Sequence, residues 1–534
     1  MQNLPPLIAL AAPATLAMAA LYARIEPTPT PRRFANIAIA ASIAALAFAL
    51  ATAVTVATYG PVTSPTLGFG GGGFSVHVDS LSAVMLSLVA FIGVIVVRYS
   101  RNYLDGDPGH VRFTRWLLLT LTSVLMLIIA GNIVLLILAW IATSLSLKKL
   151  LLFYPQRAAA QRAAAKKSWI SRIGDVSLIL AAGLLYAEFG TLETAAIGEA
   201  ARAAAVNAQT SLLVTAAALL IALTALLKSA QLPVHGWLIE VMETPTPVSA
   251  LLHAGIINAG GFLVLRFADV MLLATPALHL LAIVGGATAL FGSLVMLTQT
   301  SIKVQLAYST VAQMGFMLLQ CGLGAFSSAL LHIFAHSLYK AHAFLSSGSV
   351  MDLARASWTP SPGGQPHPAR LLMALAVVLA GTFGVAAAFG VSAAVNPGTV
   401  ALGAVIVMAL VHLMAGAIDE RPDAYVLVKT GAAAAAVAAV YFGLQAAMAH
   451  MTGASLPAPR TPADMADITI AALVIVSFAG VTVFQNQMAR HATQPFWQAA
   501  YVHLSHGLYL NTIANRIVLA LTPDRRRAGT RRTS

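Results

Sequence analysis

Charged side chains are scarce in this sequence. Lys, Arg, Asp and Glu make up 9% of its 534 residues, whereas 59% are hydrophobic and the mean hydropathy is +0.82. Soluble domains carry about 25% charged residues, so this chain has too few of them to cover a water-facing surface. The composition therefore excludes a soluble globular enzyme and a disordered chain.

Cysteine is almost absent, since Cys321 is the only one. A single cysteine excludes an intramolecular disulfide, a Cys-rich zinc site and a Cys-ligated iron–sulfur cluster. The chain lacks a Ser-His-Asp set, and its G-x-G-x-x-G pattern in Gly68–Gly73 lies in a loop between apolar runs rather than after a strand. We therefore expect no catalytic, cofactor-binding or metal-ligating residue in this chain.

Long apolar runs make up most of the sequence. Because a membrane-spanning helix needs about 20 apolar residues, the runs predict an all-α polytopic membrane protein with about 15 transmembrane helices. The first run lacks a basic leader and continues into further runs, so we expect no cleaved signal peptide. The expected spans are Leu7–Tyr22, Phe34–Ala57, Leu81–Val97, Trp116–Ala130, Ile133–Leu152, Ile173–Tyr186, Ser211–Leu227, Val248–Leu265, Ala277–Leu297, Val304–Leu319, Ala329–Val350, Leu371–Val395, Val400–Ile418, Val426–Ala447 and Ile468–Phe484.

Positive charge is unevenly distributed between the loops. With an outside N-terminus and 15 spans, 26 of the 31 Lys and Arg residues lie in inside loops and 3 in outside loops. This bias predicts an outside N-terminus and a cytoplasmic C-terminus. The net charge of +13 then indicates contact with anionic lipids rather than with nucleic acid. The basic stretch Arg157–Lys167 is either a topology anchor or a docking surface for a partner.

The C-terminal region differs from the spans because polar and apolar residues are mixed. Phe496–Leu521 predicts an amphipathic helix at the membrane surface, followed by a basic tail from Arg525 to Arg532.

Ionisable residues inside a span are costly, so each is a candidate for function. Lys228 closes the seventh span, and Pro233 soon after it predicts a broken helix of the kind that lines a hydrated cavity. Lys228 is either a proton carrier or a side chain that snorkels to the membrane surface. Glu240 and His253 follow this lysine closely and are further candidates for the ion pathway, and Pro245 and Pro247 predict a further helix break.

The eleventh span carries three titratable residues on one face. His332, His336 and Lys340 follow one another at four-residue intervals, which stacks them along a helix. Because histidine titrates near neutral pH, this pattern predicts a proton relay. A metal pair at His332 and His336 and simple packing are the alternatives, and the sequence offers no third ligand nearby.

Two acidic residues outside these clusters have competing interpretations. Asp175 lies in the sixth span, three residues after Arg172, and is either a member of the relay or half of a structural ion pair. Asp269 follows Arg266 at an outside helix end, where we expect a local cap or pair.

Several stretches together resemble the antiporter-like, proton-conducting subunits of respiratory complex I and the Mrp antiporters. The strongest are Lys228–Glu240 running into Pro245–Ala254, then Ser301–Gly315 and His332–Val350. Val78–Ser82, Ser171–Asp175 and Tyr501–Tyr509 resemble further motifs of the family, and the resemblance is strongest between Phe74 and Val350.

The resemblance implies two inverted five-helix repeats, each with a broken helix at its centre. Residues 111–266 would form the first repeat and residues 267–420 a degenerate second one, between N-terminal spans in 1–110 and C-terminal elements in 421–534. Lys228 would be the central proton-carrying lysine of the first repeat. His253, His332, His336 and Lys340 would line the central hydrated axis.

The sequence also departs from the complex I pattern. Those subunits carry a glutamate after the tryptophan of the fifth span, but Ile141 follows Trp140 here. The lysine of the second repeat is missing, because Leu371–Gly416 contains no Lys, Asp or Glu and His412 is its only ionisable side chain. Ser301 replaces a family aspartate, and the long lateral helix is absent, so these departures disfavour ordinary complex I membership.

Within the family, the chain most resembles the DabB-type membrane subunit of bacterial inorganic-carbon pumps. The resemblance implies a bacterial inner-membrane protein that conducts H⁺ or Na⁺ and is not itself an enzyme. Its partner would be a DabA-like, zinc-containing subunit on the cytoplasmic face that hydrates CO₂ to bicarbonate. A subunit of a complex I-like or hydrogenase-like redox pump, a subunit of an Mrp-type Na⁺/H⁺ antiporter and a membrane scaffold are the alternatives.

Overall fold

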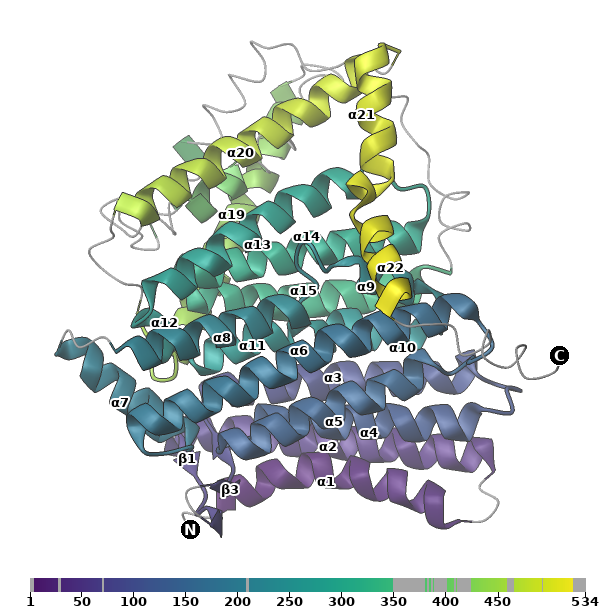
Figure 1. Cartoon of the computed structure of the whole chain (residues 1–534), viewed down its shortest axis with the longest axis vertical. Helices are drawn as coiled ribbons and strands as arrows, with labels where there is room; N and C mark the ends of the chain where they lie inside the picture. Colours follow the sequence, from purple (N-terminus) through teal and green to yellow (C-terminus); the bar gives the residue numbers. More distant parts are fainter. Residues whose placement is uncertain are drawn as a thin grey trace.

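Long helices packed side by side make up most of the protein (Figure 1). The computed structural model describes residues 4–26, 30–69, 72–207, 211–348, 424–458 and 465–521 except 492, with short helical pieces between 380 and 410. Nine helical spans in these ranges are long and apolar enough to cross a membrane. The expected all-α polytopic membrane fold is therefore confirmed.

The first helices follow the predicted spans closely. Only the sixth starts much earlier than expected, because the Ala-rich basic stretch before Trp169 continues the helix, as alanine favours. The helices are α1 (Leu4–Ile25), α2 (Pro31–Tyr59), α3 (Ser80–Tyr103), α4 (His110–Ile128), α5 (Ile133–Leu151) and α6 (Ala158–Phe189).

Two small antiparallel strand pairs lie between α2 and α3. β1 (Val62–Thr63) pairs with β4 (His77–Val78), and β2 (Leu67–Phe69) pairs with β3 (Gly72–Phe74). Gly68 lies opposite Gly73, and a Cβ on either would overlap the backbone of the other strand. These glycines permit close strand pairing, as expected for a loop rather than a nucleotide site.

The region around Lys228 is broken into short pieces. α8 ends at Lys228 and α9 begins at Gly236, with Pro233 between them. The elements are α7 (Thr194–Val206), α8 (Leu212–Lys228), α9 (Gly236–Glu240), η1 (Val241–Glu243), α10 (Thr246–Ala254), η2 (Ile256–Asn258), α11 (Ala259–Arg266) and α12 (Ala268–Leu272).

The proline pair after α9 differs from the expected helix break. Pro245 is the N-cap of α10 and Pro247 lies in its first turn, where a missing N–H leaves no hydrogen bond unmade. These prolines start a helix rather than interrupt one. The interruption falls at Gly255 and η2, within the fully buried span Thr246–Arg266.

The remaining helices complete the described bundle. They are α13 (Thr275–Met296), α14 (Ile302–Gly322), α15 (Phe326–Ser346), α19 (Ala424–Thr452) and α20 (Met465–Arg490). The predicted spans Leu371–Val395 and Val400–Ile418 lie largely outside the described residues. α13 and α14 approach closely, since a Cβ on Gly315 would come within 2.6 Å of Gly285 and Ala289 backbone atoms.

The C-terminal amphipathic segment forms two helices instead of one. α21 (Pro495–Ser505) and α22 (Leu510–Leu521) are separated by η3 (Gly507–Tyr509), where three successive residues have positive φ. In Figure 1 these yellow helices run crosswise to the bundle, and α22 lies beside α9. The strands and α7 lie at the opposite end, so we distinguish a strand end and an α9 end of the bundle.

Candidate ion pathway

Lys228 is buried at the end of α8, where Ala230 with positive φ and then Pro233 prevent the helix from continuing. Its Nζ donates to the Ser144 hydroxyl at 2.8 Å and lies 4.2 Å from the centroid of the Trp140 ring. Both partners belong to α5. The lysine therefore points into the bundle, which disfavours the snorkelling interpretation.

Asp175 of α6 supplies the negative charge of this cluster. It interacts electrostatically with Lys228 and with Lys167, another buried lysine whose Nζ donates to the Ser144 carbonyl at 3.4 Å. Arg172 instead lies over the Trp169 ring, at 5.6 Å from its centroid. Asp175 is thus within electrostatic range of Lys228, and no ion pair between Asp175 and Arg172 occurs among the described residues.

Four further relay candidates form a second cluster. Lys340 is fully buried, and its Nζ donates to the Leu306 carbonyl at 3.2 Å. His253 is also fully buried, and its ring stacks on Phe344. The ring centroids of His332 and His336 lie 6.1 Å apart, and His336 interacts electrostatically with His332, Lys340 and His253. The one-face pattern predicts the grouping of His332, His336 and Lys340 on α15, and His253 joins them from α10.

Polar groups that sequence reasoning missed lie between the two clusters. Ser229, next to Lys228, donates to the Ile257 carbonyl at 3.1 Å. Asn258 donates to the Ser337 hydroxyl at 2.9 Å, and Ser337 adjoins His336. The break at η2 turns these groups toward α8 and α15. In the sequence, Gly255 and Asn258 within an apolar span could have indicated this helix break.

Glu240 lies apart from both clusters, at the α9 end. One of its oxygens accepts hydrogen bonds from Lys166 (2.8 Å), Asn511 (3.1 Å) and Asn515 (2.7 Å). Lys166 also donates to the Asn511 side chain at 2.7 Å. Glu240 therefore ties α9 to α6 and α22, a contact between segments too distant in sequence to be anticipated.

A buried ion pair lies at the strand end of the bundle. Arg266 donates to both carboxylate oxygens of Asp79 at 3.0 and 3.2 Å. Burial by itself would raise the pKa of Asp79, but Arg266, assisted by His77 and Ser82, holds that pKa well below its usual value. Asp79 also caps α3 by accepting from the Ser82 amide.

Arg266 and Asp269 do not form the local pair that was one expectation for Asp269, the other being a helix cap. Arg266 extends from the end of α11 to the N-terminus of α3. There its guanidinium group donates one hydrogen bond to each carboxylate oxygen of Asp79. Asp269 instead pairs with Arg202 of α7 at 3.2 Å. The cause is the short turn at Phe267, after which α12 contacts α7.

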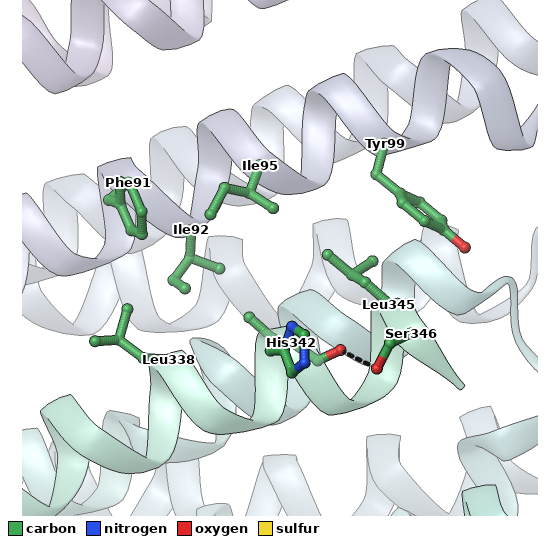
Figure 2. Close-up of a pocket in the computed structure, with 9 residues that line it drawn as sticks. Phe91, Ile92, Ile95, Tyr99, Leu338, His342, Leu345 and Ser346 are labelled. Carbon is green, nitrogen blue, oxygen red and sulfur yellow. Dashed lines mark hydrogen bonds between the residues drawn. The ribbon is translucent and has the colours of Figure 1, made fainter. Parts of the chain in front are cut away.

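No group of three His, Cys, Asp or Glu side chains that could hold a metal occurs within the described ranges. His332 and His336 consequently have no third ligand of these types there. His342 lies elsewhere, in a pocket of about 390 Å³ between α3 and α15 with largely apolar neighbours such as Phe91 and Leu345 (Figure 2). This pocket is on a different face of α15 from the relay candidates.

Comparisons with known proteins agree with this architecture. A family model described as NADH:quinone oxidoreductase/Mrp antiporter, TM, matches residues 130–357. A second, described as NADH-ubiquinone oxidoreductase (complex I), chain 5 N-terminus, matches residues 72–114. The structure of the Mrp complex from Dietzia sp. DQ12-45-1b has a chain with a TM-score of 0.60 at 22% identity, covering 98% of this chain and 61% of that one.

Two curated relatives have a higher sequence identity to this chain. The probable inorganic carbon transporter subunit DabB2 of Halothiobacillus neapolitanus is 39% identical over 97% of this chain and 94% of its own length. The probable inorganic carbon transporter subunit DabB of Hydrogenovibrio crunogenus is 45% identical over 60% of this chain and 61% of its own.

The fold and the family matches thus define a class, the antiporter-like, ion-conducting membrane subunits. The chain belongs to this family of NADH:quinone oxidoreductase and Mrp antiporter subunits, and within it to the group of the DabB subunits. It is a multi-pass membrane protein of the transporter type.

Proposed function

We propose that this chain is the cation-conducting membrane subunit of an energy-coupled inorganic-carbon uptake complex. In this proposal H⁺ or Na⁺ moves inward down its gradient through the chain. A DabA-like, zinc-containing partner on the cytoplasmic face uses that energy to make CO₂ hydration to bicarbonate effectively one-way. The zinc and the hydration chemistry belong to the partner, and this chain contributes no cofactor.

The observation that supports ion conduction is a series of buried polar groups between two lysines, Lys228 and Lys340. Ser229, next to Lys228, donates to the carbonyl of Ile257, and the adjacent Asn258 donates to Ser337, which lies one turn before Lys340 on α15. Buried ionisable groups in a membrane protein mark ion paths because their burial is otherwise unfavourable. Lysine and histidine carry protons and repel metal cations when charged, so the series favours H⁺ over Na⁺.

The assignment to carbon uptake is supported by the relatives' names and by this chain's departures from complex I. The chain aligns with 94% of the DabB2 relative, so the two share an overall plan. In the proposed orientation the α9 end faces the cytoplasm. There α22 and the basic start of α6 present a surface on which a partner could dock.

The test is growth of a carbonic anhydrase-deficient host in air, with this chain and its partner gene supplied together. Lys228→Ala should abolish growth in air but leave growth at high CO₂ intact. Lys429→Ala is the matched control, because Lys429 is exposed on α19 and lies over the Tyr425 ring.

A pull-down from detergent-solubilised membranes separates the alternatives. A single large partner that carries zinc supports the proposal. Co-purification of iron–sulfur subunits would instead assign the chain to a redox pump, and several antiporter-like subunits would assign it to an Mrp-type antiporter. Full growth of Lys228→Ala in air would contradict ion conduction through Lys228.

A further inference from the structure

The pocket between α3 and α15 has the walls of a site for a hydrocarbon chain. Phe91 and Ile95 of α3 face Leu338 and Leu345 of α15 across it (Figure 2). Its volume of about 390 Å³ lies within the range of about 300–1,000 Å³ that is usual for ligand sites. The Phe91 side chain is 42% exposed, so the pocket opens to the outside of the bundle, where a membrane supplies apolar chains.

The pocket lies in one half of the depth of the membrane. Its residues on α3 run from Phe91, near the middle of that helix, to Tyr99, near its end at Tyr103. This stretch rises about 12 Å, close to the roughly 15 Å of hydrocarbon in one leaflet. α3 begins beside β4 at the strand end, so the pocket belongs to the leaflet at the α9 end. An acyl chain in the pocket therefore has its headgroup at that end.

Basic side chains lie where such a headgroup would be. Arg98 and Arg101 are both exposed on the last turns of α3. Arg98 is the third residue after Ile95, so it adjoins the pocket wall on the helix surface. Neither arginine forms an ion pair within the described ranges. An exposed arginine in a span is costly unless it extends to polar headgroups, so Arg98 favours a negatively charged partner there.

Two polar side chains line the pocket at the same end. They are Tyr99 of α3 and His342 of α15, and His342 is exposed (Figure 2). The Tyr99 ring stacks on the Tyr103 ring, with 5.8 Å between the centroids. A tyrosine has an apolar ring and a polar hydroxyl, which suits the boundary between hydrocarbon and headgroups. Both side chains can donate hydrogen bonds to phosphate oxygens.

We infer that this pocket binds an anionic phospholipid, with an acyl chain between α3 and α15 and the headgroup phosphate at Arg98 and Arg101. Arginine binds phosphate through paired, charge-assisted hydrogen bonds. A lipid with a net negative charge is favoured over a zwitterionic one, whose own amine offsets the phosphate. The count of basic residues predicts that the α9 end faces the cytoplasm, so the lipid comes from the cytoplasmic leaflet. Lipid binding here does not depend on which ion the chain conducts.

Photo-crosslinking in the native membrane tests the site. The photoreactive residue p-azidophenylalanine replaces Phe91 in the full chain, and mass spectrometry identifies the lipids attached after illumination. The matched position is Leu145, which is 61% exposed on the α9-end half of α5 and does not line the pocket. Leu145 therefore samples the bulk lipid of the same leaflet.

We expect the adducts at position 91 to be enriched in phosphatidylglycerol and cardiolipin relative to those at position 145. Arg98→Gln and Arg101→Gln should each reduce this enrichment about fivefold, which is the usual contribution of one basic residue near anionic headgroups. Arg24→Gln is the matched control, because Arg24 is an exposed arginine in the last turn of α1, away from the pocket.

Thermal unfolding of delipidated protein gives a second measurement. Added phosphatidylglycerol should raise the melting temperature until the site is saturated, whereas phosphatidylcholine should not, because only a lipid that binds the folded state stabilises it. Leu338→Trp fills the pocket from its rim, since Leu338 is 36% exposed. This variant should lose the rise with phosphatidylglycerol while its melting temperature without lipid stays close to that of the unmodified chain.

Three results would overturn the lipid site. The same lipid composition at positions 91 and 145 would show contact with bulk lipid only. Adducts of position 91 with protein instead of lipid would show that another segment or subunit covers the pocket. An enrichment that survives both arginine substitutions would remove Arg98 and Arg101 from the headgroup site. Because growth in air is not measured in these experiments, their failure leaves the proposed function untouched.

Discussion

At the scale of single residues, the position of Asp175 matters most, because this acid balances the charge of Lys228. Lys228 contacts Ser144 and Trp140 of α5, yet α5 contributes no acid, since Ile141 follows Trp140. Asp175 of α6 provides the negative charge instead. A charge pair needs proximity in space rather than a particular helix, so α6 can supply what α5 lacks.

We expect Asp175→Asn to abolish growth in air, because it removes the charge that balances Lys228 and Lys167. Asp175→Glu should retain part of the function. Arg172→Ala should have no effect, because Arg172 stacks on Trp169. The same carbonic anhydrase-deficient host measures all three variants. Equal losses in Asp175→Asn and Arg172→Ala would instead indicate a structural ion pair.

The pair of Asp79 and Arg266 predicts a pH dependence of stability. Because Arg266 depresses the pKa of Asp79, its stabilisation is fully present above the unfolded pKa of about 3.9. The stabilisation is then lost as pH falls toward the lower folded pKa. Asp79→Asn leaves Arg266 buried without its partner, which costs about 3–5 kcal/mol.

Thermal unfolding of the detergent-solubilised protein measures this effect. The difference in melting temperature between the unmodified chain and Asp79→Asn should be constant from pH 7 to about pH 5 and should narrow below about pH 4. Glu188→Gln is the control, because Glu188 is exposed on α6. A difference that persists unchanged at low pH would rule out this electrostatic origin.

At the scale of elements, helix α22 and the broken region around α9 depend on each other. Glu240 accepts from Asn511 and Asn515 of α22, and it also pairs with the buried Lys166 of α6. A Cβ on Gly236 would overlap the Asn511 side chain, so the glycine permits this approach. The C-terminal helix is thereby fixed across the α9 end.

Removing the Glu240 carboxylate should release α22. We expect Glu240→Ala to lower the melting temperature, because the buried Lys166 loses its negatively charged partner, at a cost of about 3–5 kcal/mol. Trypsin should then cleave faster at Arg516, which is exposed on α22. Glu188→Ala is the control, and an unchanged cleavage rate in Glu240→Ala would contradict the contact.

At the scale of the whole molecule, orientation decides which way the ion path opens. The count of basic residues predicts that the strand end, with the N-terminus, faces outward, and that α22 and the C-terminus face the cytoplasm. The inward ion flow of the proposal requires the same orientation.

Epitope tags on the two termini test this prediction. In intact cells an N-terminal tag should be accessible to antibody or protease once the outer membrane is permeabilised. A C-terminal tag should be accessible only after the inner membrane is opened. The reverse pattern would invert the orientation, and with it the direction of ion flow through the chain.

Much of the fold follows from local sequence. Apolar runs of membrane-spanning length predicted the nine described helical spans, because hydrocarbon requires each backbone segment to satisfy its own hydrogen bonds in a helix. The four-residue spacing of His332, His336 and Lys340 placed them on one face for the same geometric reason. The division into two repeats stays a prediction.

Contacts between distant segments were decided only by the tertiary structure. The partners of Arg266 and Glu240, the approach of Ser144 to Lys228 and the break at η2 depend on how helices pack, which hydropathy does not encode. The sequence by itself determined which residues are buried in a membrane and which helix faces carry charge. Packing decided which of those charges meet, because electrostatic partners are chosen by distance in space.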